Sequence, residues 1–270
     1  MFGEILGATS SLNADRSACV ATFLRNLPIR VKGRPATILN LSSFCFESLG
    51  RDGKALNVGT IPLLTNEVDP LIRSLNREGI IVSRTAVRVQ FEVPSLTNIY
   101  FQAVENPILF AIKVAKVLQE NKITRSLAGT QSSPAFQRLC QRFVSILDGF
   151  ANTTFPGVCI SFQSRDFPVR ISGKPVVDNI VKSVVAGFES LSSDGKALCL
   201  ADVTLLTDEV QPFIRRVRQQ TGFMVASITD RFLSIEPTLS YVFLQTIANP
   251  ILFANQLAAV LPLQRAPAPA

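Results

Sequence analysis

The sequence predicts an α+β protein made of two tandem copies of one module, each an antiparallel sheet with helices packed on one face. The hexapeptide Asn-Pro-Ile-Leu-Phe-Ala occurs at 106–111 and returns unchanged at 249–254. Each copy also holds two strand-like segments joined across an Asp-Gly turn, and an amphipathic helical segment follows them. We therefore expect two similar halves related by a pseudo-twofold axis.

The repeats set the expected domain boundaries. Repeat one covers 1–121 and repeat two covers 134–263, and a chain of 270 residues is long enough for two such domains. The segment 122–133 is polar and small, as expected of a linker. Residues 264–270 alternate Pro with Ala, which predicts a flexible, extended tail.

Apolar patterning and turn residues place the strands of each repeat. In repeat one we expect strands at 18–24, 44–49, 55–64, 80–91 and 98–103. The counterparts in repeat two are 158–162, 184–191, 197–206, 223–233 and 240–247.

Two helices are predicted in each repeat after the hairpin. Apolar residues spaced i, i+3, i+4, i+7 begin at Val68 and again at Val210, with Thr65 and Thr207 as the expected N-caps. The repeated hexapeptide starts the last helix, with Asn as N-cap and Pro in the first turn.

The copies differ at their first helix. Repeat two begins with an amphipathic helix over 136–147, whereas repeat one keeps only its last turn at 2–6. The groove that this helix covers in repeat two should be partly open in repeat one, exposing apolar surface for self-association.

Composition limits the function. The chain contains no histidine, which removes the commonest general base and metal ligand, so we expect no catalytic residues, no metal and no cofactor. Hydrophobic residues make up 47% and charged residues 17%, a low charge content that is compatible with apolar contacts between copies. The net charge is +7, but the basic residues are scattered and Trp is absent, so we do not expect a nucleic-acid partner.

The N-terminus has no basic segment followed by an apolar one, and no apolar run is long enough for a membrane span. We expect no signal peptide and a cytoplasmic location by default, with the extracellular space or the cell or spore surface, reached by non-classical release, left open. Of the five cysteines, most are expected to be small buried hydrophobic residues.

Two motifs occur in both repeats: Phe-Glu-Ser-Leu at 46–49 and 188–191, and Asp-Gly-Lys-Ala-Leu at 52–56 and 194–198. Two further motifs are Leu139-Cys140 with Phe143, Ile146, Leu147 and Gly149, and Tyr100-Phe-Gln-Ala followed by Asn106-Pro. In these motifs the chain resembles the LppY/LpqO family, a bacterial domain of unknown function. The resemblance covers nearly the whole chain, twice.

The resemblance implies a His-Asn-His motif on one strand and a further His on the next, a cluster that looks like a metal or polar ligand site. Here the motif falls on 86–88 (Ala-Val-Arg) and 229–231 (Thr-Asp-Arg), and the later histidine falls on Tyr100 and Phe243. Every imidazole is replaced, and Arg repels a metal ion because it stays cationic. If the family site is catalytic, this chain has lost its ligands.

Arg88 and Arg231 stand at equivalent positions and could bind a carboxylate or phosphate, with Tyr100 and Asp230 as further binding candidates. The alternative is an ordinary salt bridge or a solvated side chain. The matched acids Glu47 and Glu189 could serve acid–base chemistry only if they shared a cleft. Asp52 and Asp194 are most simply turn residues beside Gly.

Two hypotheses follow. The favoured one is a non-catalytic structural protein that self-associates into an oligomer or filament. The alternative is a small-anion binding module, or a remodelled enzyme, at the lost histidine positions.

Overall fold

The first half of the molecule is a six-stranded antiparallel sheet. The computed structural model describes residues 1–12, 18–126, 132–152, 156–177, 181–220 and 222–262. In this sheet the strand order is β1-β2-β5-β6-β9-β7. The strands are β1 (Thr9–Leu12), β2 (Cys19–Leu24), β5 (Leu41–Glu47), β6 (Ala55–Leu64), β7 (Ile81–Ala86) and β9 (Leu96–Glu105).

The second half repeats this topology in the order β10-β11-β14-β15-β18-β16. Its strands are β10 (Phe150–Asn152), β11 (Val158–Ser164), β14 (Ser183–Glu189), β15 (Ala197–Leu206), β16 (Met224–Thr229) and β18 (Leu239–Ala248). Each half adds a small three-stranded ribbon. These ribbons consist of β3 (Arg30–Val31), β4 (Arg34–Pro35) and β8 (Glu92–Val93), and of β12 (Arg170–Ile171), β13 (Lys174–Pro175) and β17 (Ile235–Glu236).

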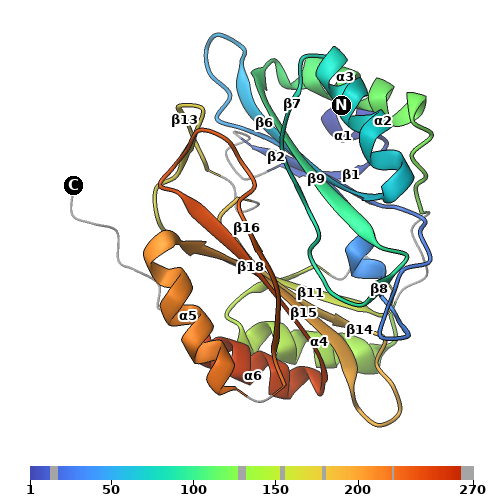
Figure 1. Cartoon of the computed structure of the whole chain (residues 1–270), viewed down its shortest axis with the longest axis vertical. Helices are drawn as coiled ribbons and strands as arrows, with labels where there is room; N and C mark the ends of the chain where they lie inside the picture. Colours follow the sequence, from blue (N-terminus) through green and yellow to red (C-terminus); the bar gives the residue numbers. More distant parts are fainter. Residues whose placement is uncertain (13–17, 127–131, 153–155, 178–180, 221, 263–270) are drawn as a thin grey trace.

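Three helices lie on the outer face of each sheet (Figure 1). They are α1 (Phe2–Leu6), α2 (Thr65–Arg77) and α3 (Pro107–Glu120) in repeat one, and α4 (Pro134–Ile146), α5 (Thr207–Gln219) and α6 (Pro250–Val260) in repeat two; a short 3-10 helix, η1 (Thr37–Asn40), precedes β5. The side chains of Asn106 and Asn249 accept hydrogen bonds from the first-turn N–H groups of α3 and α6. This confirms the capping expected from the repeated hexapeptide.

The N-cap prediction for α2 and α5 is wrong by one residue. Thr65 and Thr207 are the first helical residues, and Leu64 and Leu206 occupy the cap positions. The Glu67 carboxylate takes over the capping role, because it accepts the backbone N–H of Leu64 at 2.8 Å while it is held by a bidentate pair with the buried Arg25. Repeat two reproduces this arrangement.

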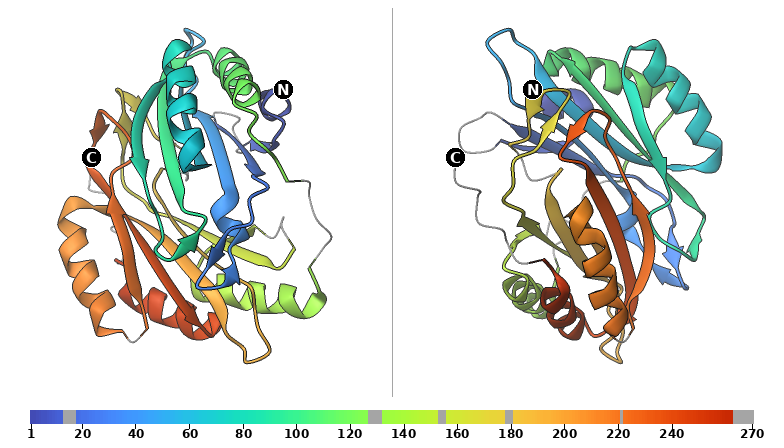
Figure 2. Two further views of the ribbon diagram at one scale, coloured as in Figure 1. Left: turned by 45° about the vertical axis from the view of Figure 1, so that its right-hand side comes forward. Right: turned by 60° about the vertical axis from the view of Figure 1, so that its left-hand side comes forward.

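The two sheets face each other across the middle of the molecule (Figure 2). The ribbon of each repeat packs on the sheet of the other: Ile29 and Val31 share a core with Leu198 and Leu200, and Ile171 shares one with residues of β5 and β6. The layers are therefore helices, sheet, sheet, helices, and the expected pseudo-twofold relation is confirmed.

Matched glutamine side chains join the repeats across this interface. The amide of Gln102 exchanges two hydrogen bonds with the backbone of Leu233, at 2.8 and 3.1 Å. The amide of Gln245, its counterpart, does the same with the backbone of Gln90, at 2.7 and 3.2 Å. Because both side chains are buried, these bonds fix the two sheets in one relative position.

Three further features bear on the sequence expectations, and the first of them is a correction. The strands predicted at 80–91 and 223–233 end at Ala86 and Thr229, so the two matched arginines lie on loops. Ile123, near the start of the expected linker, packs into the core of repeat one. Two of the five cysteines, Cys140 and Cys159, form a disulfide between α4 and β11, whereas the other three are free and buried as expected.

The groove expected beside the truncated helix is closed at Phe46. In repeat two the rings of Phe136 and Phe143 of α4 pack on the ring of Phe188, at centroid distances of 5.3 and 5.1 Å. The counterpart of Phe188 is Phe46, which stays only 8% exposed because Phe2 packs on its ring at 5.1 Å. The single turn of α1 is therefore enough to cover this part of the sheet.

Candidate functional site

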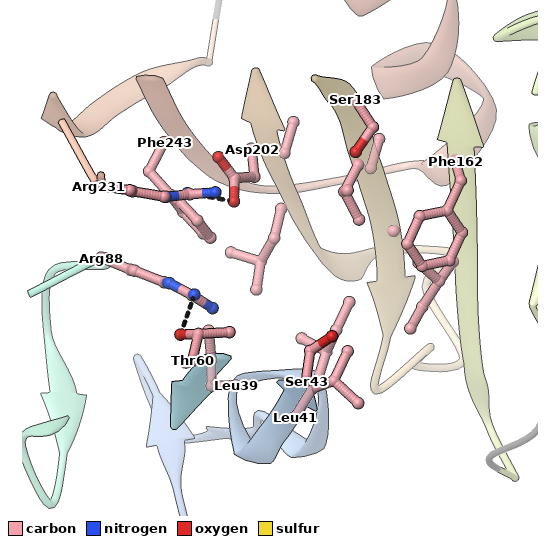
Figure 3. A pocket seen from close by; sticks show the side chains of 17 residues that line it. Leu39, Leu41, Ser43, Thr60, Arg88, Phe162, Ser183, Asp202, Arg231 and Phe243 are labelled. Atoms are coloured by element: carbon pink, nitrogen blue, oxygen red, sulfur yellow. Dashed lines mark hydrogen bonds and ion pairs between the residues drawn. The ribbon is translucent and has the colours of Figure 1, made fainter. Parts of the chain in front are cut away.

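A cavity of about 120 Å³ lies between the two sheets and is lined by both repeats. Arg88 and Arg231 reach it from the loops that follow β7 and β16, and Figure 3 shows them side by side at one end. Phe162 of β11 lies at the opposite end, and Leu41 and Ser43 of β5 lie between. The structure thus brings the two sequence-matched arginines into one cavity.

Arg88 is held by neutral groups. Its Nε donates to the hydroxyl of Tyr100 at 2.8 Å, and one terminal nitrogen donates to Oγ1 of Thr60 at 3.1 Å. Its guanidinium also lies near the rings of Tyr100 and Phe243, at 5.3 and 5.7 Å. Among the described residues no carboxylate forms an ion pair with Arg88, and these bonds use only two of the five N–H groups of a guanidinium.

One carboxylate lies in the neighbourhood of Arg88 without pairing with it. Glu92 accepts the backbone N–H of Leu96 at 2.8 Å. Burial raises the pKa of the Glu92 carboxyl above its ordinary value, and the bond from Leu96 and the charge of Arg88 only partly oppose this shift. Glu92 is thus hydrogen-bonded to the backbone of Leu96 and forms no salt bridge with Arg88.

Arg231 has the opposite environment. One terminal nitrogen donates to Oδ2 of Asp202 at 2.5 Å, and the two side chains are 9% and 14% exposed. The guanidinium lies 3.9 Å from the Tyr241 ring and 5.0 Å from the Tyr100 ring. Burial alone would lower the pKa of Arg231, but the charge of Asp202 reverses this and raises it. For Arg231 the ordinary salt bridge is therefore the correct interpretation.

The difference between the two arginines comes from one matched position. Thr60 on β6 pairs in register with Tyr100, and Asp202 on β15 pairs in register with Phe243. Thr60 and Asp202 are thus equivalent, and so are Tyr100 and Phe243. Repeat two supplies a carboxylate to its arginine, whereas repeat one supplies two hydroxyls.

Asp230 lies outside this cavity. Its carboxylate forms an ion pair with Arg84 at the surface, where both side chains are more than two-fifths exposed. Of the four candidate residues, the structure therefore groups Arg88, Arg231 and Tyr100 and separates Asp230. Sequence reasoning missed Thr60 and Asp202, although aligning 56–64 with 198–206 would have exposed the difference.

The comparisons with known proteins follow the duplication. A family model described as "Domain of Unknown Function (DUF1259)" matches residues 1–120 and again residues 141–263. The chain belongs to this family. It therefore carries a DUF1259 domain in two copies, and the LppY/LpqO name stays a prediction.

No curated protein matches this DUF1259 chain. Two solved structures align with it at low similarity. A double-ringed trimeric shell protein from the RMM microcompartment has 9% identity and a TM-score of 0.21, covering 88% of this chain and 94% of its own. EtuB from Clostridium kluyveri has 6% identity and a TM-score of 0.21, covering 90% of this chain and 85% of its own. At these TM-scores neither likeness carries an argument.

The other matched acids of the DUF1259 repeats have structural roles. Glu189 accepts the backbone N–H groups of Thr37 and Ile38 at 2.7 and 2.9 Å, and Glu47 accepts that of Val177 at 2.6 Å. Each glutamate therefore bonds to the backbone of the other repeat.

The turn aspartates behave as expected. Asp52 and Asp194 accept the N–H two residues on, at 3.1 Å in both turns. In the part of the chain that the structure describes, no cluster of three Cys, Asp or Glu side chains is arranged to hold a metal ion. Within that part, no helix is both long and apolar enough to span a membrane.

Proposed function

We propose that this chain is a non-catalytic module that binds one small anion in the cavity between its sheets, with Arg88 as the charged partner. The observation that carries the proposal is the contrast between the two arginines. Asp202 neutralises Arg231, whereas the guanidinium of Arg88 forms its hydrogen bonds within the described part of the chain with the hydroxyls of Tyr100 and Thr60. An arginine beside a cavity with free N–H groups is suited to a carboxylate or phosphate.

Unpartnered polar atoms beside Arg88 support a polar occupant. Arg231 Nε and Asp202 Oδ1 are buried and have no hydrogen-bond partner among the described residues. Buried polar atoms are nearly always bonded to protein, water or ligand, because an unmade bond costs about 1–3 kcal/mol. A bound anion, with the water it carries, would place acceptors and donors within reach of them.

The chemistry of the cavity favours binding over catalysis. Hydrolytic or transfer chemistry needs a general base or an activated nucleophile. Among the described lining residues Asp202 is the one acid, and it is committed to Arg231. The hydroxyls of Ser43, Thr60 and Ser183 have no base to activate them, since the chain has no histidine.

The test is a titration with acetate and with inorganic phosphate, followed by proton–nitrogen NMR of the Arg88 Nε–H signal. Binding should shift this signal in the wild-type chain. Thr60→Asp copies the carboxylate of repeat two and should fill the site internally, and Arg88→Ala removes the partner, so each should weaken binding by about 10-fold or more.

Arg84→Ala is the matched control, because it removes an arginine of the same sheet edge that lies outside the cavity. The affinity of Arg84→Ala for acetate and phosphate should stay within about twofold of the wild-type value. Equal binding by the Arg88→Ala variant, read from the neighbouring backbone signals, would overturn the proposal, and so would the absence of any saturable shift.

Self-association stays a second candidate, supported by one surface. Leu109 and Ile112 lie on one face of α3 and are 46% and 52% exposed. Ile112 is unmatched, because its counterpart on α6 is Asn255. Light scattering over a concentration series should then show an oligomer that Ile112→Asn dissociates, whereas a monomer at every concentration would exclude this role.

The disulfide bears on the location of the protein. Disulfides persist in oxidising compartments and are rare in the cytosol. The Cys140–Cys159 bond thus favours the extracellular or surface location over the cytoplasmic default. Alkylation mass spectrometry on the native protein would decide this, because an unoxidised pair would remove the argument.

A further inference from the structure

The cavity has two chemically different ends. Arg88, Arg231 and Asp202 gather at one end, and the aromatic ring of Phe162 lies at the other (Figure 3). The other lining residues are mainly aliphatic and include Ile38, Leu41, Ile160 and Val185. A small inorganic anion would contact the charged end only and would leave the apolar walls facing water, whereas an amphipathic ligand would cover both.

Charge limits the ligand further. Asp202 cancels the charge of Arg231, whereas Arg88 has no salt-bridge partner among the described residues and so contributes one positive charge to the cavity. One carboxylate matches this charge, whereas a dianionic phosphate would leave a buried negative charge without a partner. The Asp202–Arg231 pair itself shows that a carboxylate fits at the equivalent arginine.

We propose that the ligand is a short aliphatic monocarboxylate, whose carboxylate binds Arg88 beside Thr60 and whose carbon chain extends toward Phe162. The proposal rests on the anion-binding function proposed above and specifies its ligand class. Size agrees with it: apolar cavities of about 150 Å³ hold benzene, so about 120 Å³ suits roughly five or six non-hydrogen atoms. Butyrate has this size.

The experiment compares acetate, butyrate and inorganic phosphate as probes of the full-length chain, again through the Arg88 Nε–H signal. Each buried methylene contributes up to about fourfold in affinity, so butyrate should bind about 10-fold tighter than acetate. Phosphate should bind no tighter than acetate. Arg88→Ala should abolish the binding of all three probes, which is read from the neighbouring backbone N–H signals because this variant has no Nε–H group at position 88.

A second variant tests whether the carbon chain of the ligand extends toward Phe162. Ser43 lies between the two ends of the cavity, and Ser43→Leu fills the space beyond the charged group (Figure 3). It should reduce butyrate affinity to that of acetate while the acetate affinity stays unchanged. Phe162→Ala removes the far wall instead and should lower butyrate affinity without changing acetate, which keeps the test decisive if Ser43→Leu folds poorly.

The outcomes separate the two proposals. If acetate and phosphate bind through Arg88 but butyrate gains nothing, the anion site stands and the ligand class is wrong. If phosphate binds tightest, the ligand is a phosphate and the monocarboxylate is excluded. If no probe binds, or if Arg88→Ala changes nothing, both proposals are overturned.

Discussion

Replacing Asp202 with Thr gives repeat two the residue that repeat one has at the equivalent position. In the wild-type chain Asp202 pairs with Arg231, and both side chains are at least 86% buried. Removing one partner of a buried pair costs about 3–5 kcal/mol, because a charge stays behind without compensation. The rings of Tyr241 and Tyr100 lie 3.9 and 5.0 Å from the guanidinium and keep part of the stabilisation. We therefore expect Asp202→Thr to lower the free energy of unfolding by an amount near the lower limit of this range, about 3 kcal/mol.

The assay is urea unfolding followed by circular dichroism, with Asp230→Thr as the matched control. Asp230 also pairs with an arginine, but both side chains of that pair are substantially exposed, so its loss should cost less than about 1 kcal/mol. Adding butyrate should restore part of the stability of Asp202→Thr, because Arg231 then becomes a second anion site. A ligand at 100 times its dissociation constant stabilises by about 2.7 kcal/mol.

One result would refute this reasoning. If Asp202→Thr and Asp230→Thr lose the same small amount of stability, Arg231 does not depend on its carboxylate. An uncompensated arginine in this cavity would then have no need of an anion, and the argument for Arg88 would fail with it.

The remaining predictions concern the contacts that hold the repeats together. Gln102→Leu and Gln245→Leu should each cost about 1–3 kcal/mol in urea unfolding, and by similar amounts, because the pseudo-twofold axis makes their bonds equivalent; very unequal losses would contradict this equivalence. Burial raises the pKa of Glu189 to about 7, against the hydrogen bonds from the backbone of Ile38 and Thr37. Its folded-state pKa then exceeds the unfolded value, so its contribution is complete below about pH 4.5 and is lost as the pH rises through about 7. Between pH 5 and pH 8 the free energy of unfolding of the wild-type chain should fall by up to about 3 kcal/mol relative to that of Glu189→Gln. A difference between the two chains that does not change with pH would exclude the raised pKa of Glu189. Replacing Cys140 and Cys159 together by Ser should lower the free energy of unfolding by about 3 kcal/mol, since the disulfide closes a loop across 19 positions of sequence. An unchanged free energy of unfolding would show that the disulfide is not formed.

Local patterns predicted much of the fold. The strands at 55–64 and 197–206 and the helix starts at Asn106 and Asn249 depend on alternation, turns and caps, which are properties of neighbouring residues. The strand predicted at 80–91 was too long for a related reason. Its apolar residues continue to alternate beyond Ala86, but there Val89 alone is buried at the interface between the repeats, whereas Val87 and Phe91 are exposed.

The site was predicted only in part, because it depends on contacts between distant segments. Equivalence in the repeat pointed to Arg88 and Arg231, and the fold places them in one cavity. Asp202 was missed because matched residues were compared, whereas the informative feature is the mismatch with Thr60. The disulfide was missed because nothing in the sequence places Cys140 of a helix against Cys159 of a strand.

The duplication itself explains why the two arginines differ. Both guanidinium groups lie within 5.3 Å of the Tyr100 ring, so no more than about 10 Å separates them. At an effective dielectric constant of about 20, two positive charges at that distance repel by about 1.7 kcal/mol, and more if they are closer. An exactly symmetric pair would carry this repulsion inside a partly apolar cavity. The carboxylate of Asp202 removes this repulsion and leaves Arg88 as a single cation, which is the condition that the proposed binding of one monoanion requires.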